Sequence, residues 1–320
     1  MLQEVENKVD RFSRILNKFG TIIILFLLIL AITMINPNFL EMNNLLNILQ
    51  QVSINGLVAL GMTFVILTGG IDLSVGAILG LTGMILGLMI LGGIPEAVAI
   101  IVVLGLGAIL GFTNGIFISK LKLQPFIVTL ATMAMFRGIT LIISDGIPAM
   151  NVTQNAPILD FFSQGKIFGI PFPSIIFVIA FLTLMILLQN TVFGRGVYAI
   201  GGNEEVARLS TVPTNRVKTM VYVISGITSA LAGIILTSRL SSAQPTAGQS
   251  YEMDAIAAVV IGGTSLAGGR GRIFGTFIGV LIIGVINNGL NIIGVSAFYQ
   301  QFIKGLIILL AVILDRKSNK

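Results

Sequence analysis

The chain has 320 residues, of which 55% are hydrophobic and 10% are charged, and its mean hydropathy is +1.00. A soluble domain carries roughly 25% charged residues because its surface faces water, so this composition predicts an all-α membrane protein, a polytopic helical bundle. The chain contains no cysteine and no histidine, which excludes disulfides and thiolate metal sites and removes the commonest general base. We therefore expect no cofactor, no metal site and no enzymatic activity.

Apolar stretches that could cross the membrane follow one another along the chain, since a span needs about 20 mostly apolar residues. About ten are expected, at 19–36, 44–68, 74–92, 96–118, 124–143, 173–189, 217–238, 253–268, 274–292 and 298–314. The stretch at 253–268 is short and rich in glycine, so eight spans with a re-entrant pair is the alternative. A single transmembrane domain over 19–314 would lie between a cytoplasmic segment, 1–18, and a cytoplasmic tail, 315–320.

The basic residues indicate the orientation of these spans, because cytoplasmic loops carry an excess of Lys and Arg. If both termini are cytoplasmic, most of the 19 Lys and Arg residues fall on the cytoplasmic side, and only Lys166 and Arg239 fall outside. The loop 144–172 is then external, and a short amphipathic helix is expected in it around Ile158–Phe162. The loop 190–216 is cytoplasmic.

The cytoplasmic loop 190–216 contains the signals of a short helix. The run Gly201-Gly202-Asn203 can form a turn and an N-cap, and Glu204 and Glu205 would lie in the first turn, where acidic groups favour the helix dipole. Pro213 would end the helix. It would be about two turns long, too short to be stable alone in water. The pattern fits a docking element or an ordinary connector.

Four stretches resemble the ribose-type monosaccharide permeases of ABC importers. They are GGIDLSVGA (69–77), YAIGGNEEVARLS (198–210), RLSSAQPTAGQSYEMDAIAAVVIGGTSLAGGRGRIFGT (239–276) and NNGLNIIG (287–294), and the resemblance runs from about Asn36 to the C-terminus. It implies a permease of the bacterial plasma (inner) membrane that works as a pair, with a homodimer expected. It also implies cytoplasmic ATP-binding subunits and a periplasmic or lipid-tethered sugar-binding protein.

Within this resemblance, residues 204–210 look like the coupling loop of such permeases. The residues that would contact the ATPase are Glu204, Glu205, Ala207, Arg208 and Leu209. Permeases of this group usually have Gly where Thr211 stands, which puts the shape of the last turn in doubt. The chain has no GxxxxGK[ST] phosphate loop, so ATP hydrolysis would need a partner. Lipid is the other expected partner, and nucleic acid is not expected.

Polar side chains inside the predicted spans are candidate sites, because polar groups in hydrocarbon are costly unless they face protein or a water-filled path. Those found here are mostly neutral donors and acceptors, which suit an uncharged polyol such as a sugar. The candidates to line a translocation path are Gln50, Gln51, Asn55, Asn114, Asn287 and Asn291. The alternative for each is an interhelical hydrogen bond, worth about 0.6 kcal/mol.

The charged residues in or near the spans have simpler interpretations. Arg137 and Lys304 can extend their charged ends toward the membrane surface. Glu252 and Asp254, near Arg239, are expected to form a local ion pair, and the alternatives are a sugar contact or docking of the sugar-binding protein at this external edge. Asp72 is expected to cap a helix, with an ATPase contact as the alternative.

Taken together, we expect the permease subunit of an ABC importer, which forms an alternating-access path for ribose or a related monosaccharide. The alternative is a self-sufficient secondary transporter or channel for a small neutral solute. A secondary transporter would need an ion-coupling charge within the membrane, and buried carboxylates are absent from the clear spans.

Overall fold

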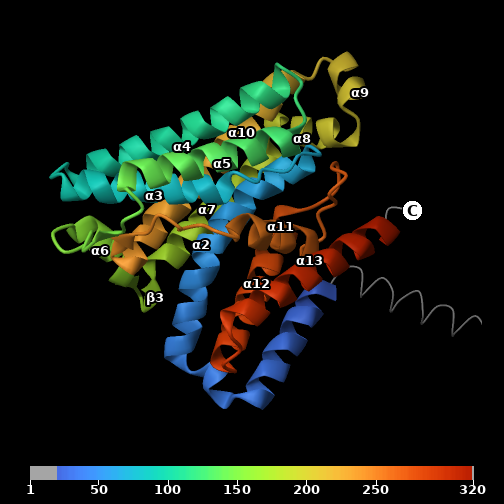
Figure 1. Cartoon of the computed structure of the whole chain (residues 1–320). Coiled ribbons are helices and arrows are strands. Elements are labelled where there is room, and N and C mark those ends of the chain that lie inside the picture. Colours follow the sequence, from blue (N-terminus) through green and yellow to red (C-terminus); the bar gives the residue numbers. More distant parts are fainter. Residues whose placement is uncertain (1–19, 319–320) are drawn as a thin grey trace, which may run out of the picture.

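The structure is a computed structural model that describes residues 20–318, and it is built almost entirely from helices (Figure 1). The predicted cytoplasmic segment 1–18 lies outside the described residues. In chain order the helices are Gly20–Ile35, the 3₁₀ helix η1 (Pro37–Leu40), α2 (Met42–Leu67), α3 (Val75–Leu91), α4 (Glu96–Ser119), α5 (Pro125–Ser144), α6 (Pro157–Gln164), α7 (Phe172–Asn190), α8 (Val192–Gly202), α9 (Glu204–Leu209), α10 (Thr214–Leu240), α11 (Tyr251–Ile261), α12 (Ile273–Ile292) and α13 (Ala297–Ser318).

The prediction of a helical membrane protein is confirmed. Six helices among residues 20–318 are long and apolar enough to cross a membrane, namely α2, α4, α5, α7, α10 and α12. Three apolar helices are shorter, namely Gly20–Ile35, α3 and the Ala297–Leu310 part of α13. Each predicted span except 253–268 therefore corresponds to one continuous apolar helix.

The segment 253–268 does not form one continuous helix. Helix α11 has 11 residues and ends at Ile261, because the chain turns at Gly262 and at Gly263, whose φ of 85° lies in the left-handed region. At 1.5 Å per residue it is about 16 Å long, roughly half of a bilayer core of about 30 Å. The rest of the segment is a glycine-rich loop.

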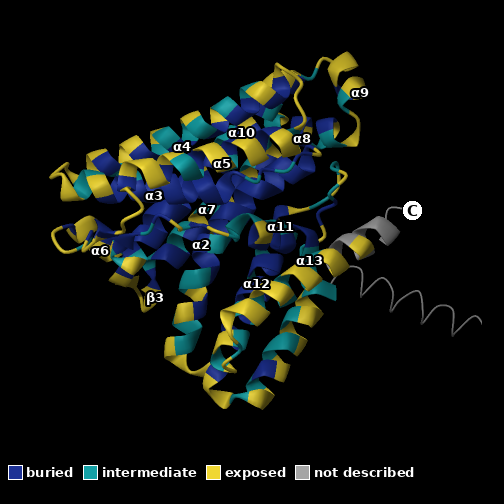
Figure 2. Ribbon diagram, viewed as in Figure 1, coloured by how far each residue is buried: buried dark blue, intermediate teal, exposed yellow. Residues whose placement is uncertain are grey.

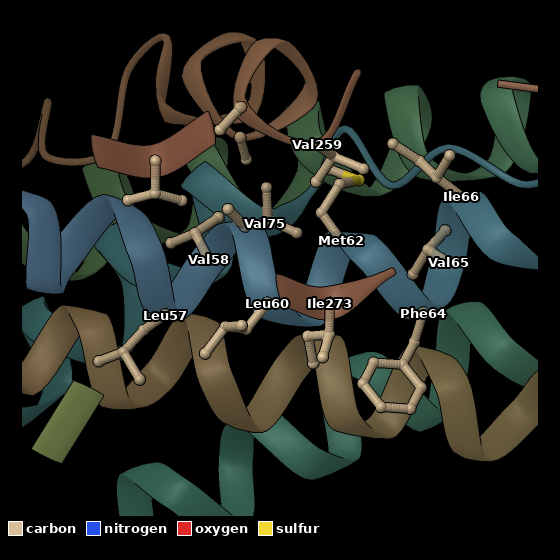
Figure 3. Packing of buried hydrophobic residues seen from close by; sticks show 14 of the residues in the cluster. Leu57, Val58, Leu60, Met62, Phe64, Val65, Ile66, Val75, Val259 and Ile273 are labelled. Carbon is tan, nitrogen blue, oxygen red and sulfur yellow. The ribbon is translucent and has the colours of Figure 1, made fainter. Parts of the chain in front are cut away.

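Helix α2 lies at the centre of the bundle. Of the 18 consecutive residues of α2 that are most apolar, 78% are buried inside the structure, whereas only 22% of the corresponding residues of α4 are buried. Figure 3 shows its side chains, Leu57 and Phe64 among them, beside Val75 of α3, Val259 of α11 and Ile273 of α12. A helix that is apolar on all sides belongs inside a helical assembly, and the exposed residues lie mainly on the outer helices (Figure 2).

The two ends of the bundle carry different elements. At one end, the strands β1 (Ala149–Met150) and β4 (Ser242–Ala243) pair antiparallel, and α6 confirms the predicted amphipathic helix of the loop 144–172. The strands β2 (Lys166–Ile167) and β3 (Ile170–Pro171) form a second small pair there. At the other end α9 projects beside α8 (Figure 1).

Helices α4 and α10 cross at close range because glycines face each other. A Cβ added at Gly111 would lie 3.1 Å from the Cα of Val223, and one added at Gly226 would lie 3.1 Å from the Cα of Gly111. A Cβ added at Gly115 would likewise lie 2.8 Å from the Cα of Thr219. Small residues spaced by four positions allow the backbones of membrane helices to approach closely.

We expect the substitution Gly111→Leu to destabilise the protein, because the added side chain must push α4 away from α10. Overpacking of a well-packed interior costs roughly 1–3 kcal/mol. The measurement is the thermal unfolding midpoint of the detergent-solubilised protein. Gly105→Leu is the matched control on the same helix, since a Cβ at Gly105 meets nothing within 4 Å. Equal midpoints for the two variants would contradict this account of the crossing.

Candidate functional site

A polar cavity of about 620 Å³ lies between α2, α10, α11, α12, α13 and the segment 244–249. Its wall consists of Gln51, Asn55, Leu236, Arg239, Leu240, Gln244, Thr246, Ala247, Gly248, Gln249, Tyr251, Asp254, Asn287, Asn291, Gln300 and Lys304. The mixture of amides, charges and apolar side chains is suited to a small polar molecule, because polar groups converge on it from several helices.

Four of the six predicted path residues line this cavity. Gln51 and Asn55 come from α2, and Asn287 and Asn291 come from α12. Each pair is four residues apart, which places both side chains on one face of the helix. The structure therefore brings together two polar pairs that lie far apart in the sequence.

The other two predicted path residues lie elsewhere. The Gln50 side chain points toward α6, where its Nε2 donates to the carbonyl of Ser163 at 3.4 Å. Asn114 is fully buried in α4, and its Nδ2 donates to the Oγ of Ser74 at 2.8 Å. For Asn114 the contact is the interhelical hydrogen bond that was the alternative to a role in the path.

Asp72 stands at the centre of the buried group that includes Asn114. Its Oδ1 accepts from the backbone N of Ser74 at 3.0 Å and from the Ser74 Oγ at 2.6 Å, and its Oδ2 accepts from Ser225 Oγ at 2.8 Å. The carboxylate thus fixes the turn before α3, but the N-cap residue of this helix is Ser74 and no side chain makes a cap hydrogen bond there, so the expected cap by Asp72 is not found. Because Asp72 is fully buried, it is not available at the surface for a partner subunit.

Two charged residues in the cavity wall are paired differently from the prediction. Asp254 accepts from Lys304 at 2.9 Å, and their side chains are only 7% and 24% exposed. The predicted partner of Asp254 was Arg239, and Lys304 was expected to extend toward the membrane surface. Asp254 thus forms an ion pair as expected, but with another partner, and the expectation for Lys304 was wrong, because the sequence does not reveal that α13 packs against α11.

Arg137 of α5 also has a structural partner. Its guanidinium donates to the carbonyl of Ala247, in the segment that borders the cavity. The side chain is half-buried rather than extended toward water, so the predicted extension to the surface was wrong. Arg137 instead holds the segment 244–249 against α5.

The short helix α9 forms where the sequence predicted it. The Oδ1 of Asn203 accepts from the backbone N of Val206 at 3.0 Å, which is the expected N-cap. Thr211 takes the left-handed φ of 65°, a conformation that favours Gly. The chain therefore turns there in a glycine-like conformation although it carries a threonine.

The five predicted contact residues of α9 divide into two groups. Glu204 accepts from Lys218 at 2.8 Å and from Lys122 at 3.2 Å, and Ala207 is 4% exposed, so these two residues face the body of the protein.

The remaining three face outward. Glu205 and Arg208 pair with each other at 2.6 Å on the surface, and Leu209 is 72% exposed. Val206, which the sequence analysis omitted, is 58% exposed. Its place three residues before Leu209 was the available signal, since this spacing puts both side chains on one helix face.

The attachment of α9 persists at neutral pH. Burial raises the pKa of the Glu204 carboxyl, but the hydrogen bonds and charges of Lys218 and Lys122 outweigh it and hold that pKa below its usual range. A carboxyl whose pKa is lowered by folding stabilises the fold at neutral pH and loses this contribution as the pH falls through the lowered value.

Comparison with known proteins places the chain among permeases. Over 316 residues it is 56% identical to the ribose import permease protein RbsC of Bacillus subtilis (strain 168), covering 99% of this chain and 98% of that protein. It is 49% identical to the protein of the same name from Escherichia coli (strain K12), covering 93% and 94%. It is 43% identical to the D-allose transport system permease protein AlsC of Escherichia coli (strain K12), covering 98% and 96%.

No solved structure matches the chain. Residues 44–312, which include the cavity and α9, match the family described as branched-chain amino acid transport system / permease component. This match extends over most of the chain, and the relatives align with nearly all of it. The chain therefore belongs to this family of transport-system permeases.

Proposed function

We propose that this chain is the membrane-spanning permease subunit of an ABC importer and forms the alternating-access path for ribose or a related monosaccharide. The observation that carries the proposal is the similarity, over nearly the full length, to permeases named for ribose import. The family description names branched-chain amino acids. Relatives that are 40–56% identical, however, are named for ribose, allose and arabinose, which favours a sugar.

The chemistry of the cavity supports a sugar. Its volume of about 620 Å³ falls within the range of about 300–1,000 Å³ found for small-molecule sites. The amides of Gln51, Asn55 and Asn291 offer both donors and acceptors, as the hydroxyl groups of a sugar require. We assign Gln51, Asn55, Asn287 and Asn291 to the path and leave Gln50 and Asn114 to helix packing.

We also propose that the chain crosses a bacterial inner membrane ten times and that both of its termini are cytoplasmic. The distribution of Lys and Arg supports this orientation. The backbone N of Gly269 donates to the carbonyl of Leu67, at the end of α2 near α9, whereas β4 lies at the opposite end of the bundle. Helix α11 and the loop after it thus lead from one end to the other, as one crossing requires.

The partners follow from the same assignment. The ATP-binding subunit would contact α9 through Glu205, Arg208 and Leu209, and Glu204 and Ala207 would transmit the movement to the body of the permease. A periplasmic or lipid-tethered sugar-binding protein would deliver the sugar at the opposite end, beside the loop 144–172. A second copy of the chain would complete the permease in the lipid.

A self-sufficient transporter is the second candidate, and the Asp254–Lys304 pair is the observation that favours it. Charged residues inside a membrane domain commonly mark ion pathways, and this pair lies in the wall of the cavity. Reconstitution with and without the ATP-binding subunit separates the two candidates. Uptake that continues without ATP and without that subunit would support the second.

The first prediction concerns the cargo. In a strain that lacks its own ribose permease, this chain is expected to restore uptake of labelled ribose when its ATP-binding subunit and sugar-binding protein are also expressed. Uptake of labelled leucine should stay at background. If leucine rather than ribose accumulated, the proposal of a monosaccharide would be wrong.

A second prediction concerns α9. Glu205→Arg is expected to abolish ribose uptake, because it removes the partner of Arg208 and places a second positive charge beside it on the proposed contact surface. The protein should still insert into the membrane, which is checked by its amount in the membrane fraction. Glu41→Arg, the same change at an exposed position at the start of α2, is the control and should leave uptake intact. Unchanged uptake with Glu205→Arg would argue against the coupling role.

A further inference from the structure

One cluster in the cavity wall combines charge, burial and unused hydrogen-bonding capacity. Asp254 of α11, Asn287 of α12 and Lys304 of α13 meet at a single carboxylate oxygen. The Oδ2 of Asp254 accepts from the Lys304 Nζ at 2.9 Å and from the Asn287 Nδ2 at 3.4 Å. Three helices that are separated along the chain therefore contribute one side chain each.

The hydrogen bonds inside this cluster leave several groups unused. The Oδ1 of Asn287 is buried and has no hydrogen-bond partner among residues 20–318. The Lys304 ammonium has three N–H donors, and one of them is used by Asp254. A buried acceptor without a partner is costly, and most buried polar atoms in proteins are paired. The cluster is thus incomplete by itself, and it borders a cavity, whereas the group around Asp72, where the Asn114 Oδ1 is also unpaired, is fully buried.

The unused groups fit hydroxyl groups better than ions. Asp254 and Lys304 together carry no net charge, so the pair presents a donor and an acceptor side by side. A hydroxyl both donates and accepts, and adjacent hydroxyls of a sugar could bond to Asn287 and to Lys304 together. A zwitterionic amino acid would instead have to separate the pair, because each of its charges would need one member.

We propose that Asp254, Asn287 and Lys304 bind adjacent hydroxyl groups of a monosaccharide in the cavity and determine which sugars pass. This inference rests on the proposed function and names the residues that would recognise the cargo. Arg239, the other cationic side chain in the wall, lies on α10 and is not part of this cluster. Helices α11, α12 and α13 would then meet at the sugar, so that a change in their arrangement alters its binding.

A purely structural ion pair is the competing explanation, and it makes a different prediction. Replacing both members of a buried ion pair by apolar residues of similar size is often neutral or stabilising. The double variant Asp254→Leu/Lys304→Met should therefore remain folded. If the pair only joins α11 to α13, this variant keeps ribose uptake. If the pair binds the sugar, uptake falls.

The experiment uses the complete importer in proteoliposomes, with its ATP-binding subunit and sugar-binding protein. Uptake rates are measured for D-ribose and for each of its monodeoxy analogues, at concentrations that saturate the binding protein. We expect the double variant and Asn287→Leu each to lower ribose uptake roughly tenfold, the factor for one hydrogen bond of ordinary strength. For at least one monodeoxy analogue, the substitution should lower the uptake rate less than it lowers the uptake rate of ribose. This analogue lacks the hydroxyl group that the replaced side chain binds.

The controls separate this inference from the proposed function. Lys120→Met, at an exposed lysine that follows α4 and lies outside the cavity, should leave every rate unchanged. Suppose that the unmodified importer transports ribose, but that the ratio of the ribose uptake rate to the uptake rate of each deoxy analogue is the same in all variants. Only this inference is then overturned. If the unmodified importer does not transport ribose, both are overturned. Should the double variant fail to fold, Asn287→Leu alone decides, since it leaves the ion pair intact.

Discussion

The packing of α2 on all sides is the contact on which the rest of the structure depends. Lipid is as apolar as leucine, so helices in a membrane associate by close fit rather than by the hydrophobic effect. Small residues in α2 allow this fit, since a Cβ at Gly61 would lie 2.8 Å from the Cα of Ser225 in α10. Its buried half, Leu57–Leu67, fixes α3, α10, α11 and α12 around it, while Gln51 and Asn55 from its other half reach the cavity.

Two buried polar clusters inside this bundle differ in their surroundings. Around Asp72, the carboxylate receives hydrogen bonds from Ser74 and Ser225, and it ties the start of α3 to α10. Around Asp254, the bonds with Asn287 and Lys304 leave a buried amide oxygen unpaired beside a cavity of about 620 Å³. The first cluster is fully buried between helices and stabilises the fold, although the Asn114 Oδ1 beside it is also unpaired, whereas the second borders the cavity where we propose that a sugar binds.

The short helix α9 is held in place by the body of the protein, which suits it to the proposed contact with a partner subunit. A helix of this length is not stable alone in water. Here Asn203 caps it, and Glu204 binds Lys122 and Lys218 from the body of the protein. The outward face carries the exposed apolar side chains of Val206 and Leu209. A subunit that binds this face would pull, through Glu204, on α10 and on the segment between α4 and α5.

The sequence by itself determined the membrane class, nearly all the helices and the cap of α9, because apolar length and capping are local properties. The resemblance carried by residues 239–276 also predicted the kind of permease, and the relatives bear this out. Only the tertiary structure decided that α11 stops at Ile261 and that Asp254 pairs with Lys304. Polar residues on separate helices give no sequence signal of which ones meet, because helix packing alone places Asn287 beside a cavity and Asn114 away from it.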